Sequence, residues 1–453
     1  MRPIALPITL TVPGADLALT VVEAAAPGPV VLIRTPYGRQ HHLAEADAWA
    51  RHGFPCVVGD VRGRFESTGE FQPYRHERAD GAAVVDWITR QPFCDGQVLP
   101  VGGSYAAYCA ITAALARQDK VLGVIAAVPA LGAGETVREP GGAARLACRV
   151  GWWSEHGDTR LPRPPRDTSD LVTRTPVSDI HLKSVGWQRL WTAPRRDPGL
   201  WNQIPTTRVP LLAVGGLVDP FAADTVELAR SWGGATRLLM GPWGHELDTR
   251  RALGHKIGKT YLDWVHALDR LHGHKELIAV TDEGHWRPIA ASHERFDLVV
   301  EQAGFVADPD RPYPEHREHN HAVLRTTLPE GEIRGPFAVE LTTEVDCADA
   351  DWFVHVWLGG TYLGHGVRRI RDGAKQFTVD CPPAGVKVTA NAELTVEIAG
   401  HNWPRHARNP HTGQDPFTAT ELLPSTRAVL AATVVLPWAW DDTDAVRAEE
   451  IAA

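Results

Sequence analysis

The stretch at residues 98–106 constrains this chain more than any other part of its sequence. It reads VLPVGGSYA, which is a valine-rich strand, a glycine turn, a serine and the start of a helix. A serine at such a strand-to-helix turn carries its hydroxyl above the edge of a sheet. The backbone N–H groups of the helix that follows face any oxyanion formed there. Ser104 is therefore the candidate nucleophile.

Two downstream strands end in the residues that such a serine needs. A serine is a weak nucleophile at neutral pH and requires a histidine to take its proton and an acid to orient that histidine. Residues 209–219 read as a buried strand ending in Asp219, and residues 237–240 as a strand running into the turn that holds His245. Taken singly, Asp219 could cap a helix and His245 could be a turn residue. Their shared position past strand ends, in the chain order of α/β-hydrolases, favours a catalytic triad.

Tyr37 is the candidate for a side-chain oxyanion donor. The segment RTPYGR at residues 34–39 directly follows a predicted strand, so its tyrosine can place a phenol on the same side of the sheet as the serine. With the backbone N–H of Tyr105, this hydroxyl would complete an oxyanion hole. A loop at residues 60–70, rich in charge and glycine, follows another predicted strand at the same edge.

The first 128 residues alternate apolar β-branched runs with helical patterns, which is typical of βαβ units around a mostly parallel sheet. The expected strands lie at residues 30–33, 55–59, 96–101 and 123–128. Helical spacing of apolar residues predicts one helix between the first two strands and another over residues 79–90. We expect residues 1–129 and 206–272 to form this α/β core.

Residues 130–205 lose this periodicity and accumulate arginine, proline and tryptophan. An insertion at this point, between two core strands, is where a lid would cover the serine. A surface excursion without a catalytic role is the alternative. Four tryptophans here could line an acyl pocket, but large aromatic residues more often anchor irregular segments by packing. We assign none of the four to the site: Trp153, Trp187, Trp191 and Trp201.

The pattern changes again after the helix expected around residues 261–271. Short strand-like runs with polar turns follow, which predicts an all-β sandwich over residues 273–453. These runs are at residues 277–280, 296–300, 337–343, 352–358, 377–379, 393–398 and 428–436.

Length and charge exclude several classes of protein. A chain of 453 residues is too long for one ordinary domain, and 43% hydrophobic with 22% charged residues is typical of a globular protein. The net charge of −9 comes without a basic stripe, so no nucleic-acid partner is expected. The N-terminus lacks a signal core and no run reaches the length of a spanning helix. We therefore expect a cytoplasmic protein with no membrane partner.

Cysteines and histidines show no convincing metal-binding spacing. Six scattered cysteines without a C-x-x-C motif are expected to be free thiols. Zinc sites usually show closer pairs than the histidines that recur at five-residue intervals, so a surface or interdomain loop is favoured for His401, His406 and His411. The pair His272 and His274 is interpreted as structural. Because a phosphate loop is absent and the turn at 102–104 lacks a dinucleotide fingerprint, we predict no metal and no cofactor.

Six ordered motifs together resemble the family of cocaine esterases and X-prolyl dipeptidyl peptidases. The resemblance extends into the predicted sandwich at residues 335–336 and at residues 401–413. The second of these is similar to the family's Phe-Pro-Arg…Arg-Asn-Pro…Gly segment. The six motifs are TPYGR at 35–39, DVRGR at 60–64, DWI with QPFC at 86–94, GGSY at 102–105, GGLVD at 215–219 and GPWGH at 241–245.

The resemblance implies an α/β-hydrolase core, an inserted helical cap and a C-terminal jelly-roll domain. It also implies site roles that agree with the reading of the residues themselves. They are Ser104 as nucleophile, His245 as general base and then acid, Asp219 as its orienter, and the Tyr37 hydroxyl and Tyr105 amide as oxyanion donors.

This sequence departs from the family pattern in its elbow and in its cap. Family members usually have a glycine three residues after the serine, where this chain has Ala107. The segment at 130–205 is shorter than the cap of many relatives. Peptidase members also need an acidic site for a free substrate amine, and the sequence identifies no equivalent.

The resulting hypothesis is a serine hydrolase that cleaves an ester or amide of a small acyl compound or short peptide, with dipeptidyl-peptidase-like activity included. An acyltransferase with the same triad and an alcohol or amine acceptor is the alternative, since the cap decides whether water is excluded. A binding protein whose sandwich carries the function is a third reading, and the intact triad argues against it. Pairing into a homo-oligomer is left open.

Overall fold

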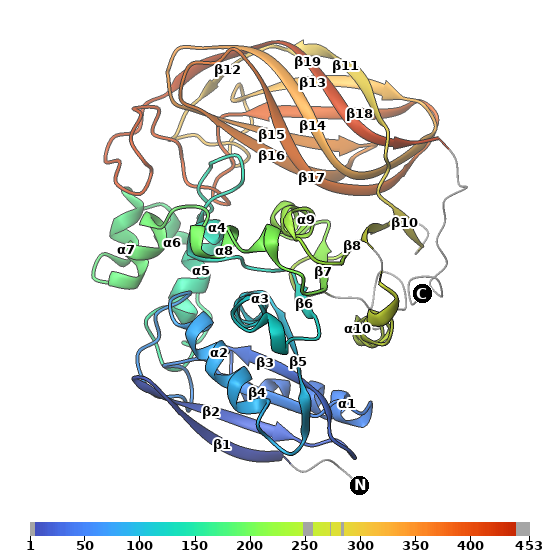
Figure 1. The fold of residues 1–453 in the computed structure, drawn as a ribbon. Coiled ribbons are helices and arrows are strands. Elements are labelled where there is room, and N and C mark those ends of the chain that lie inside the picture. The colour runs from blue at the N-terminus through green and yellow to red at the C-terminus, as the bar shows by residue number, and fades with distance from the viewer. Residues whose placement is uncertain (1–4, 248–256, 272, 282–284, 441–453) are drawn as a thin grey trace.

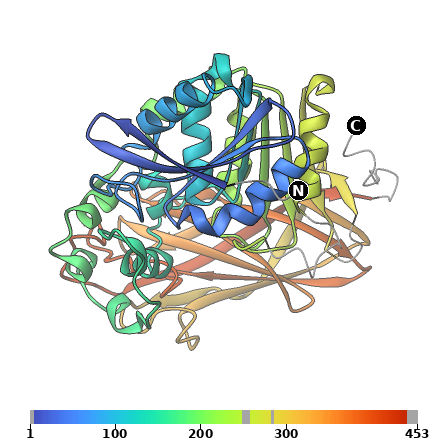
Figure 2. The same cartoon turned by 90° about the horizontal axis from the view of Figure 1, so that it is seen from below.

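The computed structural model describes residues 5–247, 257–271, 273–281 and 285–440. Two large sheets dominate it, one in the N-terminal half and one in the C-terminal half (Figure 1). A group of short helices lies beside both (Figure 2). In the described part of the chain, every helix is too short or too polar to cross a lipid bilayer.

The first sheet has ten strands in the order β1-β2-β4-β3-β5-β6-β7-β8-β9-β10. Strands β3 to β9 run parallel, and antiparallel pairs close the sheet at both ends. The carboxyl ends of the parallel strands therefore meet at one edge. The strands are β1 (Ala5–Val12), β2 (Ala15–Val22), β3 (Gly28–Thr35), β4 (Cys56–Asp60), β5 (Cys94–Gly103), β6 (Val124–Ala127), β7 (Leu211–Gly216), β8 (Thr236–Gly241), β9 (His274–Ala279) and β10 (Trp286–Pro288).

Helices cover both faces of this sheet because its strands are apolar on both sides, as parallel strands usually are. Alternate residues of β3 point to opposite faces: Val31 packs with α1 and α10, whereas Val30 packs with α2. Helices α3 and α9 lie on the same face as α2. The helices are α1 (Leu43–Arg51), α2 (Glu77–Ile88), α3 (Tyr105–Ala116), α9 (Ala222–Ser231) and α10 (Ile257–His266), with short 3-10 turns η1 (Arg39–His42), η2 (Gln118–Lys120) and η5 (Leu268–Arg270).

The segment between β6 and β7 is helical and packs around tryptophan. Trp153, Trp187 and Trp191 are buried together in one apolar cluster, and Trp201 packs against the core. This placement agrees with the packing role that the sequence favours for these residues. The elements are α4 (Ala133–Val137), α5 (Ala147–His156), α6 (Ser169–Val172), η3 (Val177–His181), α7 (Val185–Thr192), α8 (Pro198–Trp201) and η4 (Ile204–Thr206).

The second sheet is antiparallel throughout and encloses its own apolar core. Its order is β16-β15-β18-β13-β11-β19-β14-β17, and β12 pairs with β19. The jelly-roll connectivity stays a prediction. The strands are β11 (His293–Gln302), β12 (Gly304–Ala307), β13 (His321–Leu328), β14 (Gly331–Val345), β15 (Ala350–Leu358), β16 (Thr361–Ile370), β17 (Gln376–Val388), β18 (Ala392–Ala399) and β19 (Ser425–Ala439).

One strand lies in a different sheet from the one that the sequence predicts. The run at 277–280 was expected to open the C-terminal domain, but it belongs to β9, which pairs in parallel with β8. The following β10 pairs with β9, so the first sheet extends to Pro288, beyond the expected boundary at residue 272. A four-residue apolar run carries no information about its pairing partner, which explains this difference.

Candidate active site

Ser104 occupies a strained turn between β5 and α3. Its backbone has φ 55° and ψ −121°, in a region that residues other than glycine rarely adopt. Gly102 makes the turn feasible, because a Cβ at this position would lie 2.2 Å from the carbonyl oxygen of Ala106. The close approach of helix to strand and the positive φ together hold the serine at the tip of the elbow.

The structure brings Ser104, His245 and Asp219 together. The Nε2 atom of His245 lies 2.8 Å from Ser104 Oγ, and its Nδ1 lies 2.9 Å from Asp219 Oδ1. The Asp219 side chain is fully buried, while that of His245 is 32% exposed. Helix α9 begins at Ala222, and the residue before it makes no side-chain capping bond, so Asp219 orients the imidazole instead of capping a helix. This geometry lets Nε2 accept the serine proton.

Tyr37 lies beside the serine with its phenol held in place. The Nε1–H of Trp152 donates to Tyr37 Oη at 3.2 Å. Burial raises the pKa of Tyr37, although hydrogen bonds with Trp152 and Ser104 and the charge of Arg149 offset part of the rise. The phenol therefore keeps its proton at neutral pH and can donate it in a hydrogen bond.

Tyr105 contributes through its backbone only. It is the first residue of α3, where N–H groups have no acceptor within the helix. Its side chain points elsewhere: the hydroxyl donates to Glu77 and accepts from the backbone N–H of Tyr74 at 2.8 Å. The amide of Tyr105 and the Tyr37 phenol are thus candidate donors to an oxyanion at Ser104.

A cavity of about 880 Å³ contains Ser104, His245 and Tyr37. Helix α5 supplies several of its walls and Phe221 another. The insertion therefore covers the serine, as the sequence predicts. The α5 residues in the wall are Cys148, Arg149, Trp152, Glu155 and His156.

Sequence reasoning missed the two α5 residues that bear most directly on the chemistry, Arg149 and Trp152. The available signal was their spacing, since residues three apart on a helix share a face. Sequence reasoning also found no acidic site, yet three carboxylates line the cavity: Glu45, Glu155 and Glu246.

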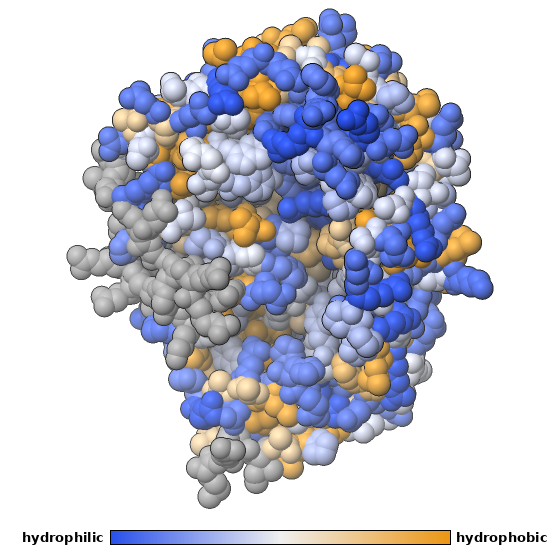
Figure 3. All heavy atoms as spheres, turned by 180° about the vertical axis from the view of Figure 1, so that it is seen from behind, coloured by the Kyte–Doolittle hydropathy of each residue, from blue (hydrophilic) through white to orange (hydrophobic). Residues whose placement is uncertain are grey.

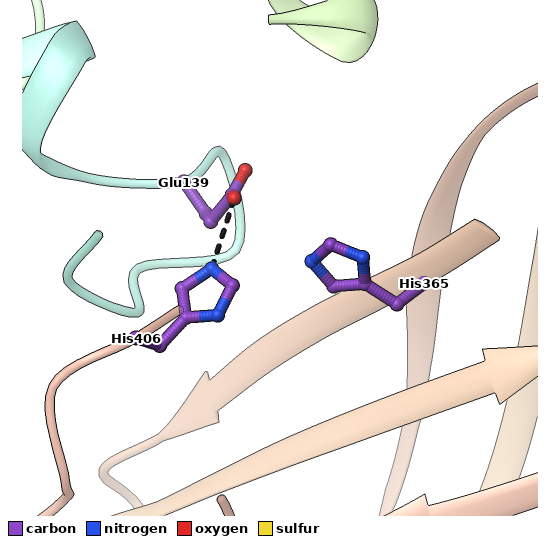
Figure 4. Close-up of side chains that lie close together, drawn as sticks. All are labelled: Glu139, His365 and His406. Carbon is purple, nitrogen blue, oxygen red and sulfur yellow. Dashed lines mark hydrogen bonds and ion pairs between the residues drawn. The ribbon is translucent and has the colours of Figure 1, made fainter. Parts of the chain in front are cut away.

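A second group of polar side chains lies between the insertion and the C-terminal sheet. Figure 4 shows Glu139, His365 and His406, whose potential ligand atoms lie within 4.8 Å of one another. The Glu139 carboxylate already accepts from Arg145 at 2.8 and 3.1 Å and lies 3.0 Å from His406 Nε2. A divalent cation would face the buried Arg145 guanidinium, so we interpret the group as an interdomain contact.

The three histidines of the stretch at 401–413 are buried, so of the two expected placements the interdomain loop is confirmed and the surface loop is not. His401, His406 and His411 are 2%, 0% and 7% exposed. The loop joins the insertion through backbone hydrogen bonds, including Leu146 N–H to the Arg405 carbonyl at 2.8 Å. The residue His274 lies in β9 and pairs with Glu276, whereas residue 272 is outside the described residues.

The sheet order, the elbow and the positions of the three residues past strand ends define an α/β-hydrolase type of fold. The model of the family described as X-Pro dipeptidyl-peptidase (S15 family) matches residues 4–246. The chain belongs to this family, which confirms the resemblance seen in its motifs.

Two curated relatives carry esterase names. The chain is 28% identical over 274 residues to a cocaine esterase of Rhodococcus sp. (strain MB1 Bresler), covering 52% of this chain and 47% of that protein. A putative serine esterase of Mycobacterium bovis is 46% identical over 55 residues, covering 12% of this chain and 9% of the relative. The match thus spans about half the length of the cocaine esterase and a small part of the mycobacterial protein.

Solved structures share the fold over almost the whole chain. An aminopeptidase from a marine sediment archaeon, Thaumarchaeota archaeon, superposes with a TM-score of 0.78 at 17% identity, covering 96% of each chain. An α-amino acid ester hydrolase gives a TM-score of 0.78 at 18% identity, covering 96% of this chain and 97% of the other. A CocE/NonD family hydrolase from Staphylococcus aureus gives 0.66 at 13% identity, covering 96% and 93%.

Proposed function

We propose that this chain is a serine hydrolase that cleaves an ester or amide of a small acyl compound or short peptide through an acyl-enzyme intermediate. The observation that carries the proposal is the relay from Ser104 Oγ to His245 Nε2 at 2.8 Å and from His245 Nδ1 to Asp219 at 2.9 Å. The relay opens into the cavity described above. The esterase and peptidase names of the family and relatives support the same reaction class.

In the first half-reaction, Ser104 Oγ attacks the carbonyl carbon while His245 Nε2 takes its proton. The bond from that carbon to the alcohol oxygen or amine nitrogen then breaks, and His245 returns the proton to the leaving group. In the second half-reaction, water attacks the acyl-serine with His245 again as base. Asp219 holds the imidazole in the required tautomer throughout.

The tetrahedral intermediates place negative charge on the former carbonyl oxygen. The proposed donors to it are the Tyr37 hydroxyl and the Tyr105 backbone N–H. Because Trp152 donates to Tyr37 Oη, the phenol hydrogen is left to point at the oxyanion. This arrangement supports a role for the cap in preparing the oxyanion hole.

We also propose the domain plan that accompanies this function. The α/β-hydrolase core takes residues 1–129 and 206–288, the helical cap residues 130–205, and a jelly-roll sandwich the remainder. The inclusion of β9 and β10 in the first sheet supports the shifted boundary. The apolar cluster shared by the cap and the loop at 401–424 supports a fixed cap rather than a loose one.

Labelling with a fluorophosphonate probe tests the nucleophile. The wild-type protein should be labelled and should hydrolyse short-chain esters, whereas Ser104→Ala should do neither. Ser154→Ala is a matched control, because Ser154 is a buried cap serine outside the cavity, and it should be labelled as the wild type is. Persistent labelling of Ser104→Ala, or an unlabelled wild type, would contradict the proposal.

A substrate screen then separates esterase from amidase and peptidase activity. Short-chain nitrophenyl esters, aminoacyl amides and X-Pro amides are compared, with Ser104→Ala as the blank. Ester turnover is expected to be the fastest, since an alkoxide or phenolate leaves more readily than an amine. Product analysis with added alcohols or amines shows whether an acceptor other than water is used.

A further inference from the structure

Arg149 is a buried cation without an anionic partner. Its side chain lies on α5 in the wall of the active-site cavity and is only 7% exposed. Within the described residues its guanidinium makes no hydrogen bond or ion pair, and Nε is buried without an acceptor. Its close contacts are aromatic rings: Cζ lies 6.0 Å from the ring of Trp152 and 5.7 Å from that of Phe221.

The neighbouring arginine shows how unusual this is. Arg145, four residues earlier and just before α5, also stacks on Phe221 and is paired with carboxylates. It lies 2.8 Å from Glu139 and 2.8 Å from Asp224. A buried charge is strongly unfavourable unless an opposite charge or hydrogen-bond acceptors compensate it. The chain supplies that compensation to Arg145 and not to Arg149.

The position of Arg149 links it to the reacting groups on two sides. Trp152, on one side, donates to Tyr37 Oη at 3.2 Å. Phe221, on the other, has its ring 5.5 Å from that of His245. The positive charge also acts on Tyr37, whose pKa it helps to lower against the larger effect of burial. An anion held by Arg149 would therefore lie close to the bond being cleaved.

The carboxylates of the cavity lie in a different environment. Glu45 is 40% exposed and pairs with His42 at 3.1 Å. Glu155 is 34% exposed and lies 3.9 Å from His156, and Glu246 is also exposed. Water can solvate such groups without a ligand, so they demand no cationic substrate. The charged group of the cavity wall that is 7% exposed and has no carboxylate partner among the described residues is the Arg149 guanidinium.

We propose that Arg149 binds a carboxylate of the substrate, so that the preferred substrates are esters or amides that carry a second, ionised carboxyl group. Half-esters of dicarboxylic acids and esters of hydroxy acids belong to this class. A guanidinium binds a carboxylate through two parallel N–H donors, and an aromatic wall on each side fixes its plane. The inference rests on the proposed hydrolase function and names its substrate class.

Two pairs of esters test it, one for each side of the cleaved bond. Mono-4-nitrophenyl glutarate is compared with 4-nitrophenyl hexanoate, and 4-carboxyphenyl butyrate with its methyl ester, in each case with Ser104→Ala as blank. The wild type should have the higher kcat/KM for the anionic member of at least one pair. Arg149→Met should lower that value by about 30- to 100-fold, the loss expected for a hydrogen bond to a charged group. Its kcat/KM for neutral esters should fall by a clearly smaller factor, because no bond to a charged substrate group is lost there.

Arg149→Lys and Arg189→Met are the matched controls. The lysine variant keeps the charge without the planar fork and should fall between wild type and Arg149→Met. Arg189 is a cap arginine outside the cavity that bonds to Gln72 at 3.0 Å, and Arg189→Met should leave the preference unchanged. Equal losses for charged and neutral esters, or a preference for neutral or ammonium-bearing esters, would overturn the inference.

A binding measurement keeps the inference separate from the proposed function. Glutarate should raise the Tm of Ser104→Ala and should not raise that of Ser104→Ala/Arg149→Met, since a ligand stabilises only a protein that binds it. If glutarate stabilises Ser104→Ala but the wild type neither labels nor turns over esters, the carboxylate site stands and the hydrolase proposal fails. If esters are hydrolysed without any effect of glutarate or of Arg149→Met, the hydrolase stands and the carboxylate site falls.

Discussion

The indole N–H of Trp152 donates to the phenol oxygen of Tyr37 across 3.2 Å, which joins the inserted segment to the site around Ser104. Trp152 belongs to α5, and Tyr37 follows β3 at the edge of the sheet. The Trp152 ring also stacks on that of Tyr105, with an interplanar angle of 6°. One residue of α5 thus contacts both residues that we propose as oxyanion donors, so we expect a change at Trp152 to affect the proposed oxyanion hole.

Tyr37→Phe should reduce kcat by about two to three orders of magnitude, because one oxyanion donor is removed while the ring stays. Trp152→Phe should reduce kcat less, by about tenfold, the order of one lost neutral hydrogen bond. Steady-state kinetics with a nitrophenyl ester measures both. A near-wild-type kcat for Tyr37→Phe would remove the phenol from the proposed oxyanion hole.

Asp219→Asn should reduce kcat by about 10³-fold or more while leaving fluorophosphonate labelling slow but detectable. The amide lacks the charge that stabilises the imidazolium, and it can present its NH₂ group to His245 Nδ1 and so favour the wrong tautomer. Asp224→Asn is a comparison for buried charge, since Asp224 pairs with Arg145 away from the serine and should affect stability more than kcat. Similar kcat values for Asp219→Asn and wild type would contradict the orienting role.

The sequence was informative about the site because strand ends and turns are local features. The elbow glycines and the strands that precede Asp219 and His245 are each visible within about ten residues, and parallel pairing brings them to one edge of the sheet. Arg149 and Trp152 were not identified because their importance depends on where the cap folds back onto the core. That placement comes from contacts between distant segments, such as Leu146 with Arg405.

The strands of the C-terminal half show the same limit, because their pairing also depends on contacts between distant segments. Apolar runs predicted most strands of the second sheet, but β12, β13 and β16 were missed; in β16, glycines and arginines interrupt the apolar pattern. The run at 277–280 was placed in the wrong sheet because a short strand does not encode its partner.

On the face seen in Figure 3, apolar side chains are scattered among hydrophilic ones, so this view does not suggest a docking surface for a second copy.

Gly102→Ala and Ala107→Gly, both at the elbow, should differ in their effect on activity. A Cβ at residue 102 would lie 2.2 Å from the Ala106 carbonyl oxygen, so Gly102→Ala should displace α3 and abolish activity. Ala107 is fully buried within α3, and the helix accommodates its methyl group. Ala107→Gly should lower the free energy of unfolding by about 1 kcal/mol.

Activity and thermal unfolding of the two elbow variants check this pair of expectations. Ala107→Gly should keep kcat within about twofold of wild type, since a change of a few tenths of a kcal/mol in the barrier is all that is expected. An active Gly102→Ala, or an Ala107→Gly variant that loses activity without losing stability, would show that the elbow is held by other contacts.

Glu135 should make the chain less stable as pH rises from about 4.5 to 7. Burial raises the pKa of Glu135 to about 7, and the 2.6 Å hydrogen bond from Trp201 Nε1 offsets only part of that rise. The folded chain therefore holds a proton that the unfolded chain has lost between these pH values, so the free energy of unfolding falls through this window.

Glu135→Gln removes this titration and keeps an oxygen to accept from Trp201. At pH 8 its free energy of unfolding should exceed that of wild type by about 3 kcal/mol, measured as a higher denaturant midpoint, and at pH 5 the two should match. Glu139→Gln is the opposite case: although burial raises the pKa of Glu139, Arg145 and His406 hold it well below its usual range. Glu139→Gln should therefore be less stable than wild type at both pH values. If the free energy of unfolding of Glu135→Gln depends on pH as that of wild type does, burial of ionised Glu135 does not destabilise the folded chain.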